Sequence, residues 1–336
     1  MRWAVAGCLL LAMFVFGIGV YHTVGYLKGD RNVVHRPNEV SAPPLAGTMY
    51  VVQAGAIYRF HHGSFTQITP EAGWTQPSAG PGDQLFAVRR QSNYADLYLL
   101  SSRGTTVAQM THNFTPGAAE SSHWSFYPRL SPDGSTLFYD YDPKNSYNNY
   151  QVDLAIFASP SNPGARGSVQ WTNPNDLTGG DVNPVPMRSG ALIYTKYSID
   201  DSYRVHSQIW IQRRAGSAGQ ALTAPEVGCG QPALSPDEKM LAMVCTKGSS
   251  QSADLDVATL DATSFALGSP ATLVGGQLLA SPVFSPDGKS IAYLAPSTPG
   301  GQFQLWTVGS SGPASVRNIT TDLGLDSTSA PVWVGG

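Results

Sequence analysis

Six Xaa-Pro dipeptides recur along the chain at an almost constant interval of 48 to 56 residues. They are Gln76-Pro77, Tyr127-Pro128, Asn183-Pro184, Gln231-Pro232, Ser281-Pro282 and Ala330-Pro331. A self-similar unit of roughly this length is typical of β-propellers, in which each unit forms one four-stranded blade. The spacing therefore predicts a closed ring of small sheets.

Each unit shows the same order of strands and turns. The Xaa-Pro dipeptide begins an apolar strand, a tight turn leads to a second apolar strand, and a polar loop precedes two further strands. The turn is clearest in Ser285-Pro286-Asp287-Gly288, where proline fixes φ and glycine accepts the left-handed conformation that completes the hairpin. Glu238 stands at the glycine position of the fifth unit, at a cost of about 1 kcal/mol if the geometry is kept. The expected closing pairs of the fourth strands are Ile68-Thr69, Met110-Thr111, Leu177-Thr178, Leu222-Thr223 and Ile319-Thr320.

The two ends of the repeat region complete each other. Residues 48–69 supply only three strands, whereas residues 330–334 form an Xaa-Pro strand with no strand after it. Joining the two segments in one blade closes the ring and removes the exposed sheet edges. We therefore predict an all-β fold, a six-bladed β-propeller over residues 47–336 that is closed by its N- and C-terminal segments.

The N-terminal segment differs from the rest of the chain. Residues 3–21 contain no charged side chain, and about 20 such residues span a bilayer as a helix. We expect one transmembrane helix within residues 1–27, acting as a membrane anchor, with a cleaved secretory signal as the alternative. Residues 28–46 contain three prolines and no strand pattern, which indicates a flexible tether.

Two of the three cysteines occupy symmetric positions around a predicted turn. Cys229 and Cys245 each lie eight residues from Asp237, so they would face each other on paired strands, close enough for a disulfide. Two buried free thiols are the alternative. A disulfide favours an extracytoplasmic location, on the periplasmic or cell-surface side. Lys28, Arg31 and Arg36, which follow the apolar segment, favour the opposite orientation.

The Ser-Pro-Asp-Gly turn, the apolar strand after it and the Leu-Thr type of closing pair resemble the repeat of TolB-type, WD-repeat-like propellers. Propeller domains of prolyl-oligopeptidase-type peptidases share this repeat. The resemblance covers residues 47–336 and is weakest in the turns at residues 79–83 and 187–190. It implies a propeller fold, and TolB itself is a periplasmic envelope protein. TolB carries an additional N-terminal α/β domain, in whose place this chain has the apolar segment and tether.

The sequence lacks the motifs of several function classes. The net charge is −3 and there is no cluster of basic residues, so we expect no nucleic-acid partner. No Gly-Xaa-Ser-Xaa-Gly elbow occurs, and Gly309-Ser310-Ser311-Gly312 is one residue short of it. Asp140, Asp142 and Asn145 lack the further acidic ligand of a calcium loop, and no Cys/His set has zinc spacing. We expect no metal and no cofactor.

Tyrosine, tryptophan, histidine and arginine side chains gather in loops that must emerge on one rim of the ring. Such residues form adaptable contact surfaces. Packing of these aromatic rings onto the blades is the alternative interpretation. The candidate binding residues are Arg89, Arg90, Tyr94, His123, Trp124, Tyr141, Tyr147, Tyr150, Tyr197 and Tyr203.

The sequence thus favours a membrane-tethered, non-catalytic scaffold that binds a protein, a peptide or an envelope glycan through the rim of blades 2 to 4. The alternative is a propeller enzyme, a glycan hydrolase or lyase, whose carboxylates converge on the central channel from different blades. Fold alone does not decide between the two.

Overall fold

The computed structural model describes residues 45–143, 153–248, 252–311 and 315–335. The expected anchor at residues 1–27 and most of the expected tether at residues 28–46 lie outside this part. Among the described residues, no helix is long and apolar enough to cross a membrane.

Within the described ranges, the strands form six antiparallel sheets of four strands each. Blade 1 contains β24 (Val332–Val334), β1 (Thr48–Gln53), β2 (Ala56–His61) and β3 (Ser64–Gln67), and blade 2 contains β4 (Trp74–Ala79), β5 (Leu85–Arg90), β6 (Ala95–Leu100) and β7 (Thr106–Gln109). Blade 3 contains β8 (Ser125–Leu130), β9 (Thr136–Tyr141), β10 (Ala155–Pro160) and β11 (Val169–Gln170), and blade 4 contains β12 (Asp181–Pro186), β13 (Leu192–Ile199), β14 (Val205–Gln212) and β15 (Gln220–Ala221). Blade 5 contains β16 (Cys229–Leu234), β17 (Met240–Cys245), β18 (Ala253–Thr259) and β19 (Ala271–Gln277), and blade 6 contains β20 (Ala280–Phe284), β21 (Ser290–Pro296), β22 (Phe303–Gly309) and β23 (Arg317–Asn318). Two short 3-10 helices, η1 (Ala119–Ser121) and η2 (Pro225–Val227), lie in connections between blades.

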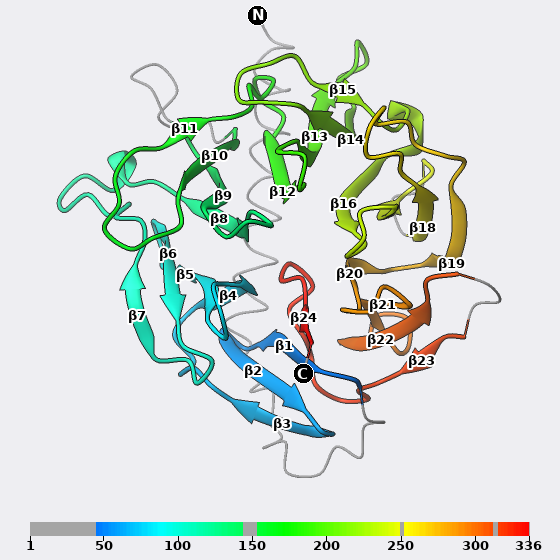
Figure 1. The fold of residues 1–336 in the computed structure, drawn as a ribbon, viewed down its shortest axis with the longest axis horizontal. Helices are drawn as coiled ribbons and strands as arrows, with labels where there is room; N and C mark the ends of the chain where they lie inside the picture. Colours follow the sequence, from blue (N-terminus) through cyan, green and yellow to red (C-terminus); the bar gives the residue numbers. More distant parts are fainter. Residues whose placement is uncertain (1–44, 144–152, 249–251, 312–314, 336) are drawn as a thin grey trace, which may run out of the picture. The chain divides into compact units, whose positions relative to one another are not determined.

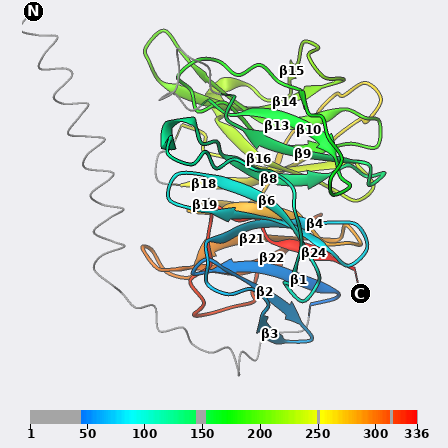
Figure 2. The same ribbon diagram turned by 90° about the vertical axis from the view of Figure 1, so that its left-hand side faces the viewer.

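The six sheets form a ring, with β4, β8, β12, β16, β20 and β24 around its middle (Figure 1). Their strands run from one face of the ring to the other (Figure 2). The C-terminal strand β24 pairs antiparallel with β1, matching Thr48 to Val334 and Tyr50 to Val332. The prediction of a six-bladed propeller closed by its two terminal segments is confirmed.

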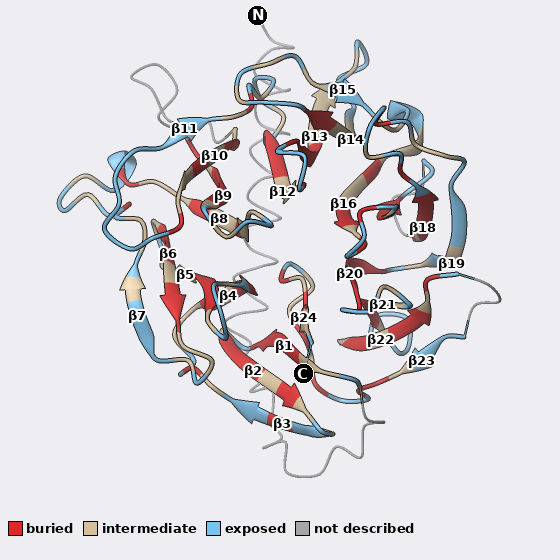
Figure 3. Ribbon diagram, viewed as in Figure 1, coloured by how far each residue is buried: buried red, intermediate tan, exposed pale blue. Residues whose placement is uncertain are grey.

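Burial follows the position of a strand in its blade. The inner three strands supply the core, and large side chains such as Phe86 and Tyr293 are fully buried between neighbouring sheets. The fourth strands β3, β7, β11, β15, β19 and β23 are mostly exposed (Figure 3). The core therefore lies between the blades, and the outer edge needs few apolar residues.

The Xaa-Pro dipeptides form bulges in the innermost strands. The residue before proline has a positive φ in five blades, and the pairing with the second strand shifts at the same place. Proline has no N–H for the ladder, so it sits where the pairing is interrupted. Side chains from elsewhere in the ring accept the N–H that each bulge frees. These bonds are Gln76 N to Ser329 Oγ, Tyr127 N to Gln76 Oε1, Asn183 N to Asp140 Oδ2, Gln231 N to Thr195 Oγ1 and Ser281 N to Gln231 Oε1.

The threonine of the closing pair holds the fourth-strand segment to the third strand through a hydrogen bond. Its Oγ1 accepts a hydrogen bond from a third-strand N–H, as in the 2.9 Å bond from Leu305 N to Thr320 Oγ1. Thr69, Thr111 and Thr223 do the same in blades 1, 2 and 4. In blade 3 the prediction of Leu177-Thr178 was wrong, because Thr172 Oγ1 accepts from Ile156 N at 3.0 Å.

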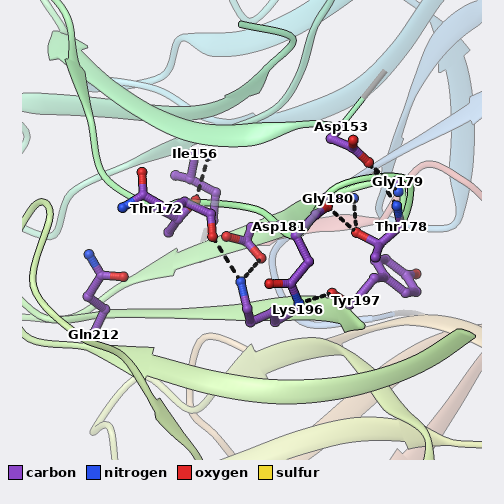
Figure 4. A network of polar contacts seen from close by, with 12 residues as sticks. Asp153, Ile156, Thr172, Thr178, Gly179, Gly180, Asp181, Lys196, Tyr197 and Gln212 are labelled. Atoms are coloured by element: carbon purple, nitrogen blue, oxygen red, sulfur yellow. Dashed lines mark hydrogen bonds and ion pairs between the residues drawn. The ribbon is translucent and has the colours of Figure 1, made fainter. Parts of the chain in front are cut away.

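Leu177 and Thr178 lie instead in the connection from blade 3 to blade 4. Their N–H groups donate to the Asp153 carboxylate at 2.8 and 2.9 Å. Figure 4 shows Thr178 beside Asp153. In the same network, Lys196 Nζ lies 3.0 Å from the buried Asp181 Oδ1. Burial raises the pKa of Asp181, and Lys196 opposes that effect. Together with the 3.0 Å bond from Lys196 Nζ to the Asn173 carbonyl, the Asp153 bonds tie the connection to both blades.

A disulfide bond joins Cys229 and Cys245, which face each other in the pairing of β16 with β17. The predicted disulfide is confirmed. Glu238, in the hairpin turn of the same blade, keeps a φ of 60°, like Gly134 and Gly288 at the equivalent positions. The turn geometry is thus retained despite the replacement of glycine.

Candidate binding site

The ring has two faces that differ in the loops they carry. The loops between second and third strands and the connections between blades emerge on one face, here called the rim face. The first hairpin of each blade and the loop between its third and fourth strands emerge on the opposite face, here called the turn face. The predicted rim residues that the structure describes belong to elements that reach the rim face.

The boundary of blades 2 and 3 brings several predicted residues together. The exposed Arg90 guanidinium lies over the Trp124 ring, 5.6 Å from its centre. Trp124 N donates to Asp142 Oδ1 at 2.7 Å, which fixes the tryptophan backbone to blade 3. The indole stacks on Phe126 at 5.9 Å. Arginine and tryptophan held in this way form a rigid contact element.

His123 and Tyr141 lie beside this pair. Their rings stack at 5.1 Å, and His123 Nδ1 lies 3.0 Å from the Asp142 carbonyl oxygen. Burial, with the charge of Asp142 as a lesser cause, raises the pKa of Tyr141 to about 12. Tyr94 packs on Phe114 at 5.1 Å. These rings therefore pack onto their neighbours, as the alternative interpretation expected, and their role in binding stays a prediction.

The other predicted residues lie apart from this cluster. Arg89 packs on Trp74, 5.6 Å from the ring centre, and burial raises the pKa of Tyr197. Tyr203 is 90% exposed at the tip of the β13–β14 hairpin. Tyr147 and Tyr150 lie outside the described residues.

Large apolar side chains are exposed on the same face. Tyr203 is joined there by Leu177, which is 72% exposed, and Phe114, which is 49% exposed. Ile199 and Val205 flank the Tyr203 hairpin and are also exposed. Phe114 and Leu177 lie in the connections that follow blades 2 and 3, and the other three belong to the β13–β14 hairpin of blade 4. Exposed apolar side chains that gather on one face are a mark of interaction surfaces.

The central channel contains groups that the sequence interpretation missed. Its neck, of about 40 Å³, is lined by residues of the Xaa-Pro bulges, including Tyr127, Asn183 and Gln231. A wider mouth of about 280 Å³ opens on the turn face. Arg129 lines both spaces. The described residues that line them include no aspartate, glutamate or histidine.

Asp140 lies behind the channel wall and is fully buried. Its Oδ2 accepts from Asn183 N at 3.2 Å, while its Oδ1 has no hydrogen-bond partner among the described residues. Burial raises the pKa of Asp140 well above its ordinary value, and the Asn183 N–H and the Arg129 charge oppose this effect. Burial also raises the pKa of Tyr127, with the charge of Asp140 as the next cause. Within the described part of the chain, no three His, Cys, Asp or Glu residues are placed to hold a metal ion.

Comparison with known proteins supports the fold. No family model matches the sequence, and a search of curated proteins finds no match. TolB from Acinetobacter baumannii is similar in structure, with a TM-score of 0.63 and 19% identity over 86% of this chain and 67% of that one. A protein assigned as TolB from Agrobacterium tumefaciens has a TM-score of 0.57 and 13% identity over 85% of this chain and 93% of that one.

An enzyme with a propeller is also similar. Oligogalacturonate lyase in complex with manganese has a TM-score of 0.52 and 13% identity over 79% of this chain and 70% of that one. Identities this low show the fold alone. The chain is therefore a six-bladed β-propeller whose structural neighbours include both TolB proteins and enzymes.

Proposed function

We propose that this protein is a membrane-tethered, extracytoplasmic scaffold without catalytic activity, which binds a protein, peptide or envelope glycan through the rim face of blades 2 to 4. The observation that carries the proposal is the exposure of Leu177, Tyr203 and other apolar side chains on the face that also carries the Arg90–Trp124 pair. An apolar surface with rigid aromatic and arginine side chains suits macromolecular recognition.

The location rests on two features of the chain. The charge-free residues 3–21 are long enough for a membrane anchor. The disulfide between Cys229 and Cys245 fits a compartment outside the reducing cytosol. The fold similarity to TolB agrees with a scaffold role.

The alternative remains a glycan hydrolase or lyase that works in the channel. The channel lining supports binding instead, because its described residues offer one cation, Arg129, and no pair of acids for general acid–base catalysis. Incubation of the protein with envelope polysaccharides, followed by measurement of new reducing or unsaturated ends, separates the two functions. Turnover that survives loss of the rim residues would favour the enzyme.

A capture experiment tests the rim directly. The full-length protein and a Leu177→Ser/Tyr203→Ala variant are immobilised and exposed to solubilised cell envelopes from the source organism. Both side chains are mostly exposed, so the variant keeps its fold. A Val107→Ser/Val169→Ser variant, changed on the exposed outer strands β7 and β11, is the matched control. We expect capture by the native and control proteins and at least a tenfold loss in the rim variant. Equal capture by all three would overturn the proposal.

A further inference from the structure

The residues that follow the Xaa-Pro dipeptides indicate a second binding site, on the turn face. These residues occupy equivalent positions in the six innermost strands, and all of them line the channel mouth: Ser78, Arg129, Val185, Ala233, Val283 and Val332. Five are small or apolar, and only blade 3 carries a charge. A single guanidinium therefore stands in an otherwise neutral ring.

Arg129 has unused hydrogen-bonding capacity. Its Nη1 donates to the Pro128 carbonyl at 3.1 Å, and among the described residues this is the one hydrogen bond of the guanidinium. A guanidinium carries five N–H donors in a planar fork. Arg129 is half-buried, and burial lowers its pKa while the charge of Asp140 opposes that effect. A desolvated cation with free donors suits an anionic ligand.

The walls of the mouth indicate the chemical character of the part of the ligand that does not contact Arg129. They consist largely of proline, valine and aromatic side chains, among them Pro232, Pro282, Phe284 and Trp333. Such walls favour an apolar group over a sugar, which needs several hydrogen-bond partners. One guanidinium matches the single charge of a carboxylate in a bidentate pair.

The mouth is closed at its inner end. The neck beyond Arg129 holds only about 40 Å³, enough for water but not for a side chain. Ser329 Oγ accepts from Gln76 N, and Ser281 Oγ donates to the Ser327 carbonyl, so the segment before β24 is fixed on the rim side of the neck. A ligand that enters from the turn face must therefore stop at Arg129.

We infer that the turn-face mouth of the channel binds a carboxylate on an apolar stem, with Arg129 as the carboxylate partner. The carboxylate can belong to the C-terminus of a peptide or to a small organic acid, and the chemistry is the same for both. A mouth of about 280 Å³ takes a short segment of this kind and excludes a folded domain.

Calorimetric titration of the full-length protein tests the inference. The probes are N-acetyl-Leu-Phe, its C-terminal amide, 4-phenylbutyrate and 4-phenylbutanol. We expect each acid to bind at least tenfold more tightly than its neutral partner, because the neutral partner cannot form charge-assisted hydrogen bonds with the guanidinium. Tighter binding of the peptide acid identifies a peptide terminus as the ligand class, and tighter binding of phenylbutyrate identifies a small acid.

Variants assign the effect to one residue. Arg129→Gln should abolish the preference for acids, whereas Arg103→Gln, which changes an exposed arginine of the loop between β6 and β7, should leave it unchanged. Val283→Asp places an acid in the same ring and should also abolish acid binding, which keeps the test valid if Arg129→Gln fails to fold. Equal binding of acid and amide to the native protein, a preference for acids that survives Arg129→Gln, or no binding of any probe to the native protein would overturn the inference. The rim face is untouched by these changes.

Discussion

The two faces of the propeller are built from one repeat but in different ways. On the turn face, the first hairpins of blades 3, 5 and 6 use the same turn, in which a serine hydroxyl donates to the aspartate two residues later, at 2.7 Å for Ser235 and 2.6 Å for Ser285. On the rim face, the described loops and connections of blades 2 to 4 share no such turn and expose Phe114, Leu177 and Tyr203. The repeat thus constrains the face where tight hairpins are needed and leaves the other free to carry recognition.

The largest expected change in stability concerns the disulfide of blade 5. Cys229 and Cys245 lie at the rim-face end of the β16–β17 pair. Closing a loop of 16 residues stabilises a fold by about 3 kcal/mol. Cys245→Ser should lower the free energy of unfolding by that amount in urea titrations under oxidising conditions. With reductant present, the native protein and the variant should differ little, and a difference that persists there would contradict the account.

A second prediction concerns the buried carboxyl behind the channel wall. The pKa of Asp140 is raised in the folded state, so its protonated form is favoured there. The buried protonated carboxyl contributes fully to stability below the ordinary pKa of an aspartate. This contribution is lost as the pH rises through the folded-state pKa. Asp140→Asn should therefore stabilise the protein by roughly 1–3 kcal/mol at pH 7.5. The gain should shrink at pH 4, and thermal unfolding at both values checks this. An equal shift at both pH values would refute the explanation.

A smaller change in stability separates two properties of Glu238 in the blade 5 turn, its backbone strain and its side-chain hydrogen bond. Glu238 has a φ of 60°, and its Oε1 accepts from Arg188 N at 2.8 Å. Glu238→Ala loses the bond and keeps the strain, so it should be less stable by about 1 kcal/mol. Glu238→Gly loses the same bond but relieves a strain of about 1 kcal/mol, and should remain close to the native stability. Denaturant midpoints for the two variants measure the difference, and equal midpoints would show that the turn is unstrained.

Much of the fold was predictable because the Xaa-Pro bulges and hairpin turns require particular residues. Proline lacks an N–H, and the left-handed turn position favours glycine, so both leave marks in the sequence. The closing pair of blade 3 was not predictable in this way. Trp171-Thr172 and Leu177-Thr178 are both an apolar residue followed by threonine, and only the bond from Ile156 N identifies Thr172.

The candidate sites were predictable to a lesser extent. Aromatic rim residues could be listed from the loops, but their sequences do not show that His123 stacks on Tyr141 or that Tyr203 is 90% exposed, because both depend on how the folded loops pack. Arg129 did leave a signal. Alignment of the six residues after the repeated prolines shows one arginine among serine, alanine and valine. That signal becomes meaningful only when the ring places all six around the channel mouth.

The smallest expected effect on stability belongs to the residue most important for the proposed function. Tyr203 is 90% exposed, so Tyr203→Ala should change the free energy of unfolding by less than about 0.5 kcal/mol. Denaturant titration of the variant checks this. A larger loss would mean that the ring packs against the propeller and is not free for a partner.

Site-specific photo-crosslinking in the source cells tests the central claim most directly. A photoreactive amino acid replaces Tyr203 on the rim face or, as the control, Val107 on the outer strand β7, where the side chain is also exposed. The account predicts a discrete crosslinked protein or glycan from position 203 that is absent from position 107 and is lost when Leu177→Ser is added. No product from position 203, or the same product from both positions, would contradict a rim-face binding site.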